Sequence, residues 1–153
     1  MSQFLFLLLD AHANRHELGL VRHEKTLVTL PRNDYEPDVC FFSREKSSAF
    51  TSEQWQFPAP DFIAEVLSDS TEALDRGIKF IDYAANGVRE YWILDPAARS
   101  IEKYLERDGR YQLHVKMREG EIESGVVAGF RVPVQALFDR ATNFAALRSL
   151  VAG

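Results

Sequence analysis

Three side chains whose types suit phosphodiester chemistry are distributed over the first half of the sequence. Asp38 follows Pro37 at the start of an apolar stretch, and Glu65 is the one charge within the apolar run that follows Asp61. Lys79 lies on a predicted helix shortly after that run. Because an ionised carboxylate inside a buried strand is costly unless a cation or hydrogen-bond donors compensate it, Glu65 needs a partner.

Two kinds of partner are open to Glu65. A structural partner would be Arg89, or a backbone amide at the start of the following helix. The other is a metal ion shared with Asp38, because Mg²⁺ prefers oxygen ligands and usually takes only one or two carboxylates. Such an ion lowers the pKa of a bound water, and a nearby ammonium such as that of Lys79 would hold this water or stabilise charge on phosphorus.

Each candidate residue also has a simpler interpretation. Asp38 after proline suits a turn cap, and Lys79 follows Asp75 by four residues, a helical ion pair worth about 0.3 to 0.5 kcal/mol. Ser68 suits either a hydrogen bond to the site or a helix cap. Tyr83, one turn after Lys79, is either a core aromatic residue or part of the lining of the site.

Other residues give weaker indications of chemistry. Asp95, before Pro96, is typical of a turn that ends a strand, and Glu90 is interpreted as a solvated or paired strand residue. The histidines lack zinc-ligand spacing: His12, His16, His23 and His114. The sequence has no glycine-rich phosphate loop, no Gly-x-Ser-x-Gly elbow and no dinucleotide fingerprint, which argues against nucleotide cofactors and serine hydrolysis.

The pattern around these residues predicts a crossover made of a strand, a helix and a second strand. Residues 37–42 and 61–67 are predicted strands, the second buried on both faces, and residues 90–96 are another. A helix is predicted over residues 71–86, with Asp69 and Glu72 at capping-box spacing. The predicted core stripe of this helix is Leu74, Ile78, Ile81 and Ala85, with Gly87 as its stop. Such a crossover implies parallel pairing of the two strands that it joins.

The remaining chain supplies the rest of one α/β domain, residues 1–153. A helix is predicted over residues 3–16, with an apolar face made by Phe4, Leu5, Leu8, Leu9 and His12. Short strands are predicted over 20–22, 25–30 and 130–132, a loop with a helical turn over 43–60, and a C-terminal helix over 134–150. Asp108-Gly109 between residues 101–105 and 111–117 predicts a hairpin.

Composition narrows the class of protein. Hydrophobic residues make up 46% and charged residues 27% of 153 residues, as in ordinary globular proteins. A net charge of −5 argues against nonspecific coating of nucleic acid, so contact with a polynucleotide must be local. Cys40 is the single cysteine, which excludes an internal disulfide and favours a reducing, cytoplasmic location. The sequence shows neither a signal peptide nor a membrane span.

Several motifs occur in a fixed order: PDVCFF, PDFIAEVLSDST, RGIKFIDYAANGVREYWILDP, a DGRY hairpin and GFRVPVQALF. From about residue 3 to residue 139 the chain resembles the Uma-two family of PD-(D/E)XK nuclease-like proteins. The resemblance implies a restriction-endonuclease-like core, a mixed central sheet flanked by helices, with a Mg²⁺ site at strand ends. Asp38 matches the family's PD aspartate and Glu65 its second acid. The usual lysine position is Leu67 here, so the basic role would pass to Lys79.

Two hypotheses follow. The first is a Mg²⁺-dependent endonuclease, with Mn²⁺ as a possible substitute, that hydrolyses DNA; Asp38 and Glu65 bind the metal and Lys79 positions water. The second is a catalytically inactive domain of the same fold that binds nucleic acid or a protein partner. The acidic charge and the lack of the family's N-terminal strand hairpin with its E-L-x-x-G element favour the second, and the retained Asp, Glu and Lys favour the first. A homodimer is expected, because two cuts on a duplex need two sites.

Overall fold

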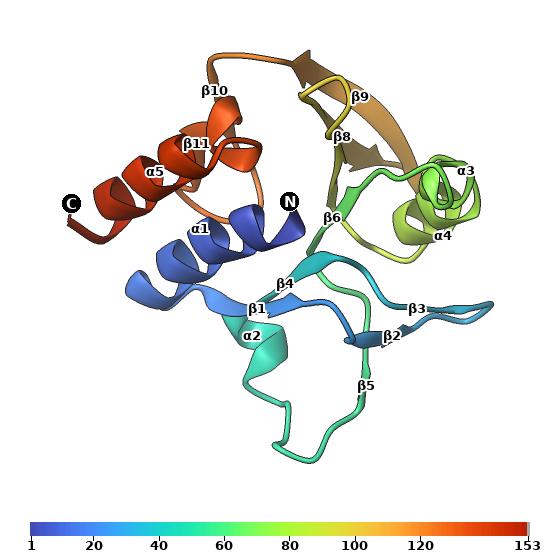
Figure 1. Cartoon of the computed structure of the whole chain (residues 1–153). Coiled ribbons are helices and arrows are strands. Elements are labelled where there is room, and N and C mark those ends of the chain that lie inside the picture. Colours follow the sequence, from blue (N-terminus) through green and yellow to red (C-terminus); the bar gives the residue numbers. More distant parts are fainter. Residues whose placement is uncertain (153) are drawn as a thin grey trace.

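A six-stranded mixed sheet forms the centre of the computed structural model, which describes residues 1–152 (Figure 1). Its strand order is β1-β4-β6-β7-β8-β9, and β6 and β7 pair in parallel while the other neighbours are antiparallel. The strands are β1 (Gly19–His23), β4 (Val39–Ser43), β6 (Phe62–Val66), β7 (Glu90–Asp95), β8 (Ser100–Arg107) and β9 (Arg110–Met117). The mixed sheet and the parallel pair predicted from the crossover are both confirmed.

One face of the sheet is covered by the two ends of the chain. Helix α1 (Ser2–Arg15) packs beside α5 (Arg140–Ala152), with the 3₁₀ helix η1 (Val134–Leu137) and the β10–β11 hairpin (Glu121–Glu123 and Arg131–Pro133) next to them (Figure 1). The predicted N-terminal helix is confirmed. The predicted helix over 134–150 is two helices, because the Asp139 carboxylate accepts hydrogen bonds from the amide and hydroxyl of Thr142 and starts α5 anew.

The opposite face carries α3 (Glu72–Asp75) and α4 (Ile78–Ala85), together with a small sheet in the order β3-β2-β5. The strands of this small sheet are β2 (Leu27–Thr29), β3 (Asp34–Tyr35) and β5 (Gln56–Phe57). A single turn, α2 (Arg44–Ser47), matches the helical turn expected within residues 43–60. The two-residue strands β3 and β5 were not predicted, because so short a segment has no periodicity to detect.

Alternate residues of the central strands point to different cores. Phe62 and Ala64 of β6 pack into the apolar cluster under α1, whereas Ile63 packs into the cluster under α4. The same alternation holds for β7, where Trp92 faces α1 and Tyr91 faces α4. Glu65 shares the parity of Ile63, so its side chain points to the α4 face of the sheet.

The crossover helix differs from its prediction in two ways. It breaks at Gly77, where an added Cβ would stand 2.5 Å from the carbonyl oxygen of Ala73. The predicted core stripe was wrong: Leu74, Ile78 and Ile81 are 49%, 40% and 61% exposed, and Ala85 is exposed as well. The buried face of α4 is instead made by Asp82, Tyr83 and Ala84. The helix is turned by its polar contacts with the sheet, described below.

The hairpin between β8 and β9 is confirmed with its turn. Asp108 and Gly109 have φ angles of 54° and 79°, the pair of positive values that a type I′ turn requires. Gly87, predicted as a helix stop, follows α4 with a φ of 86°. None of the helices within residues 1–152 has the length and apolarity that a membrane crossing needs.

Candidate active site

Glu65 lies on a central strand of the sheet and is paired on its β7 side. Strand β6 lies between β4 and β7, and Glu65 stands opposite Ile93 in the register with β7. The residue is 1% exposed. On the β4 side the ladder ends at Ala64, opposite Val39, and Glu65 follows directly after it. Because the Glu65 side chain is buried there, its charge needs partners.

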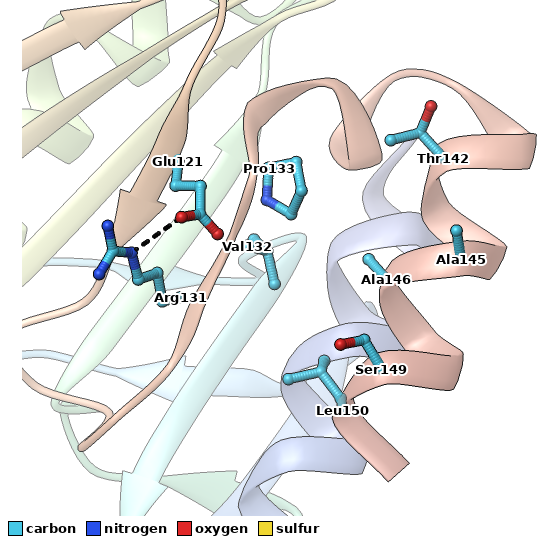
Figure 2. A pocket seen from close by; sticks show the side chains of 9 residues that line it. All are labelled: Glu121, Arg131, Val132, Pro133, Thr142, Ala145, Ala146, Ser149 and Leu150. Atoms are coloured by element: carbon cyan, nitrogen blue, oxygen red, sulfur yellow. Dashed lines mark ion pairs between the residues drawn. The ribbon is translucent and has the colours of Figure 1, made fainter. Parts of the chain in front are cut away.

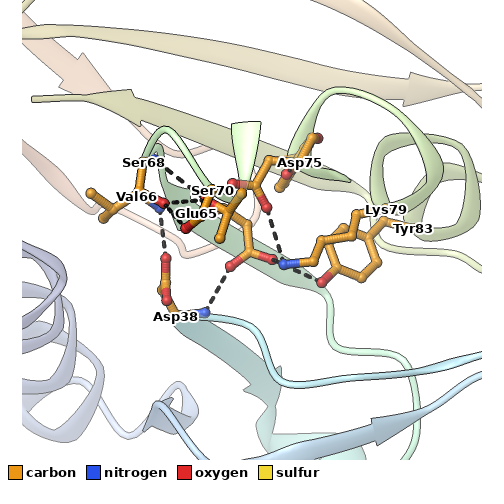
Figure 3. A network of polar contacts seen from close by, with 10 residues as sticks. Asp38, Glu65, Val66, Ser68, Ser70, Asp75, Lys79 and Tyr83 are labelled. Atoms are coloured by element: carbon orange, nitrogen blue, oxygen red, sulfur yellow. Dashed lines mark hydrogen bonds and ion pairs between the residues drawn. The ribbon is translucent and has the colours of Figure 1, made fainter. Parts of the chain in front are cut away.

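Three atoms contact the Glu65 carboxylate (Figure 3). Oε1 accepts a hydrogen bond of 2.9 Å from the backbone amide of Asp38. Oε2 lies 3.1 Å from Lys79 Nζ and accepts a bond of 2.9 Å from the Tyr83 hydroxyl. Burial raises the pKa of Glu65 to about 7; the charge of Lys79 lowers it and the charge of Asp38 raises it further. The pKa of this carboxyl therefore lies near neutral pH.

Asp38 lies just before β4 and is bound to the strand that carries Glu65. Its Oδ2 accepts a hydrogen bond of 2.7 Å from the amide of Val66, so each carboxylate is held by the backbone beside the other (Figure 3). Asp38 is partly buried, and this burial raises its pKa although the bond from Val66 opposes the shift. The reciprocal bonds place both acids at the same place on the sheet.

Lys79 on α4 contacts two carboxylates. Its side chain is 16% exposed, and Nζ lies 3.0 Å from Asp75 Oδ1 as well as 3.1 Å from Glu65 Oε2. Burial acts to lower the pKa of Lys79, but the charges of Glu65 and Asp75 outweigh it and raise that pKa above its ordinary value. The amine is therefore an ammonium at neutral pH. The simple ion pair with Asp75 and the contact with Glu65 exist together.

Asp75 is the site residue whose importance the sequence reasoning missed, whereas Tyr83 had been left open as a core aromatic residue or part of the lining of the site. Asp75 was treated only as a helical ion-pair partner, yet the residue is 1% exposed and its carboxylate lies 3.0 Å from the lysine nitrogen. Asp75, Lys79 and Tyr83 are spaced four residues apart, the spacing of one helix face. That spacing could have indicated a buried polar face, but the apolar residues on the opposite face of the helix favoured the wrong orientation.

Other candidates have different places in the structure. Arg89 lies 3.6 Å from Asp61 and is not the partner of Glu65. Ser68 bonds to the hydroxyls of Ser70 and Thr71, and no side-chain cap bond comes from Asp69. The interpretation of Asp95 as a turn residue is confirmed, because its Oδ1 accepts the amides of residues 97 and 98.

Two further residues are buried on the α1 face. Glu90 was interpreted as a solvated or paired residue, and solvation is wrong: it is 0% exposed, with Oε1 accepting the amide of Gly125 at 2.8 Å. His12 is also buried, and its Nε2 lies 2.9 Å from the carbonyl oxygen of Ala128. Both contacts belong to the packing of the β10–β11 region against the sheet.

The donor set suits a hard cation with few protein ligands. Glu65 and Asp75 are both 1% exposed and share the single charge of Lys79, with Asp38 adjacent, so the negative charge exceeds the positive charge at this point. Within residues 1–152 no three His, Cys, Asp or Glu side chains form a metal-binding group. A pair of carboxylates such as Asp38 and Glu65 matches the one or two that Mg²⁺ takes when water and substrate complete its shell.

Hollows on the surface differ in their relation to this site. One of about 280 Å³ lies between β10–β11 and α5; Val132, Ala146 and Leu150 line it, and an ion pair joins Arg131 to Glu121 at its rim (Figure 2). It contains no residue of the site. Another of about 390 Å³ adjoins the loop directly after β6, and its lining includes Leu67, Ser68 and Asp95.

Comparisons with known proteins bear on the fold and on the family. A search of curated proteins found no match. The chain is similar in structure to a protein whose crystal structure is described as that of a putative nuclease belonging to DUF820 from Anabaena variabilis ATCC 29413. The TM-score is 0.75 at 13% identity, over 95% of this chain and 79% of that one, which shows the shared fold. Residues 1–135 match the Uma2 family model, described as "Putative restriction endonuclease", and the chain therefore belongs to the Uma2 family.

Proposed function

We propose that this protein is a Mg²⁺-dependent endonuclease that hydrolyses phosphodiester bonds of DNA. The observation that carries the proposal is the group formed by Asp38, Glu65 and Lys79. Glu65 accepts the amide of Asp38, Asp38 accepts the amide of Val66 next to Glu65, and the Lys79 ammonium lies 3.1 Å from Glu65. A structural role alone gives no reason to place this excess of negative charge beside a central strand, since desolvating charge is costly. Membership of a family described as restriction endonucleases supports the same function.

The residues divide the work as follows. Asp38 and Glu65 would hold the cation, which supplies a water of lowered pKa and charge stabilisation on phosphate oxygen. Lys79 would orient the attacking water and stabilise the negative charge that builds up on phosphorus. The water oxygen bonds to phosphorus, one phosphoester P–O bond breaks, and the departing oxygen takes up a proton. Tyr83 holds the Glu65 carboxylate in its rotamer by donating to Oε2.

Cleavage of supercoiled plasmid DNA with Mg²⁺ or Mn²⁺ tests this function. The site variants are Glu65→Gln and Lys79→Met, which keep side-chain volume, and the matched controls are Glu53→Gln and Lys116→Met at exposed positions. We expect the site variants to lower the cleavage rate about 100-fold or more and the controls to leave it unchanged. Cleavage that survives both site substitutions would reject the assignment.

A second candidate is a nuclease-fold domain without activity that binds nucleic acid or a protein. The observation in its favour is that both oxygens of Glu65 already have protein partners, so the site is satisfied without a metal. Titration calorimetry with Mn²⁺ separates the two. Absence of both cleavage and Mn²⁺ uptake would establish the binding domain in place of the enzyme.

We further propose that the protein acts as a homodimer, because one site cuts one strand and a duplex break needs two sites. Sedimentation velocity measures the state, and the plasmid products test its consequence. A dimer is expected to give linear DNA early in the reaction, whereas a monomer gives nicked circles that become linear only later.

A further inference from the structure

Asp75 is the second carboxylate on the ammonium of Lys79, and its place in the fold is firmly set. It is the last residue of α3, and its amide bonds to the carbonyl of Thr71 at 2.9 Å. Its own carbonyl oxygen accepts a hydrogen bond of 2.9 Å from the hydroxyl of Tyr91, a buried residue of β7. Asp75 is therefore tied both to its helix and to the sheet, while its side chain points at Lys79 (Figure 3).

We infer that Asp75 is a positioning residue, which keeps the Lys79 ammonium in place during the reaction while Glu65 serves the metal. The inference rests on the proposed function and adds a residue to it. In the structure, Lys79 Nζ is nearly equidistant from the two acids, at 3.0 Å from Asp75 and 3.1 Å from Glu65. A lysine has a flexible stem and three donors, so it needs a fixed acceptor to hold one orientation.

The need for Asp75 follows from what a cation does to Glu65. A divalent ion on Glu65 neutralises the charge that attracts Lys79 and repels the ammonium directly, so this contact weakens when the site is loaded. Asp75 lies on α3 and not on the sheet strand that carries Glu65, and its carboxylate remains available to Lys79. The ammonium is then retained at the site and cannot turn toward solvent, to which the lysine side chain is already 16% exposed.

Asp75 is assigned to the lysine and not to the metal because of its contacts. Its Oδ1 accepts a hydrogen bond from Nζ of Lys79, whereas the two backbone bonds at the site run from the Asp38 amide to Glu65 and from the Val66 amide to Asp38. No group of three acids suited to a metal occurs within the described chain, residues 1–152. A positioning residue and a metal ligand make different predictions for binding, which the experiment uses.

A double-mutant cycle on the whole protein tests the role. Asp75→Asn and Lys79→Met are made singly and together, and kcat and KM for a duplex oligonucleotide are measured with saturating Mn²⁺. We expect Asp75→Asn to lower kcat about 10- to 100-fold with KM changed less than about 3-fold, and to have almost no further effect in the Lys79→Met background. Residual activity of Lys79→Met is measured at high enzyme concentration.

Two further measurements exclude other roles. Titration calorimetry of Asp75→Asn with Mn²⁺ is expected to give a dissociation constant within about 5-fold of the wild type, whereas loss of a ligand would weaken binding about 10- to 100-fold. A crystal structure of the wild type with Mn²⁺ is expected to keep Lys79 Nζ within about 3.5 Å of Asp75. This measurement needs no variant to fold.

The outcomes are distinguishable. If the wild type cleaves and the two substitutions reduce kcat additively, Asp75 acts independently of Lys79 and the inference is overturned while the proposed function stands. Separation of Lys79 from Asp75 in the Mn²⁺ structure overturns it in the same way. If the wild type cleaves no DNA under any condition, the proposed function fails, and the positioning role fails with it.

Discussion

Helices α1 and α4 lie on opposite faces of the same sheet and bury opposite kinds of surface. Helix α1 turns Leu5, Leu8 and Leu9 toward the sheet, each 0% exposed. Helix α4 exposes Ile78 and Ile81. The face of α4 that turns toward the sheet carries polar groups where apolar side chains would be expected. One helix is oriented by apolar burial and the other by hydrogen bonds and charge.

The polar face of α4 is satisfied group by group. The Asp82 carboxylate is contacted by Arg32, Asn33 and Tyr35 from the β2–β3 region. These bonds lower the pKa of Asp82, with the bond from Tyr35 contributing most. Because an unpaired buried charge would be far more costly than an exposed isoleucine, these partners fix the rotation of the helix. Helix α1 therefore contributes mainly apolar burial, whereas α4 contributes mainly polar contacts, including those of the candidate site.

The largest change in the free energy of unfolding is expected from a substitution on the apolar face of α1. Leu9→Ala removes a fully buried side chain from the main apolar cluster and should lower the free energy of unfolding by about 2 to 5 kcal/mol. Urea denaturation monitored by circular dichroism measures the change. Leu7→Ala on the same helix is the matched control, because Leu7 is 42% exposed and its truncation should cost far less. Equal losses for the two variants would contradict the contrast.

The next effect concerns the pH dependence of stability that Glu65 confers. Its pKa in the folded protein is raised to about 7 from an ordinary 4.5, so the folded state binds this proton more tightly than the unfolded state does. The contribution of Glu65 to the free energy of unfolding is fully present below pH 4.5 and is lost as the pH rises through 7. It amounts to about 3 kcal/mol in all. Unfolding free energies are compared between wild type and Glu65→Gln in EDTA across this range. A difference between them that does not change with pH would refute the prediction.

A smaller effect is expected at the hydroxyl of Tyr83. Tyr83→Phe removes a donor to Glu65 Oε2 without changing the ring that packs in the core, and should cost about 1 to 2 kcal/mol at pH 8. The cost should shrink toward pH 5, because a protonated Glu65 depends less on donors. Tyr104→Phe is a control that removes a hydroxyl bonded to Glu102, outside the site. A Tyr83→Phe penalty that is the same at both pH values would show that the hydroxyl does not serve the carboxylate.

The smallest effect is expected on the outer face of α4. Ile81 is 61% exposed, so Ile81→Ala should change the free energy of unfolding by less than about 0.5 kcal/mol. Measurements at two protein concentrations check whether self-association covers this face. A loss above about 1 kcal/mol that grows with protein concentration would show that the exposed stripe is an interface and not a free surface.

Much of the fold was predictable because local rules and tertiary packing agree there. The buried strands around Ile63 and Ile93, the helix carrying Leu8 and the turn at Asp108-Gly109 all follow from periodicity or turn chemistry. The candidate site was predictable in part, because Glu65 is the only charge in an apolar strand and a buried charge requires a partner. The role of Glu65 as a metal ligand and the role of Lys79 in orienting water stay predictions.

The amino-acid sequence was sufficient to predict the buried central strands, the hairpin, the N-terminal helix and three residues suited to phosphodiester chemistry. Three features emerge only in the folded chain: the face of α4 that turns inward, the sharing of Lys79 between Asp75 and Glu65, and the backbone bonds from the Asp38 amide to Glu65 and from the Val66 amide to Asp38. The reason is physical. Apolar periodicity reports the average preference of a helix face for water, whereas the rotation of α4 depends on partners such as Arg32 and Tyr35, which are distant in sequence and become neighbours only when the sheet has formed.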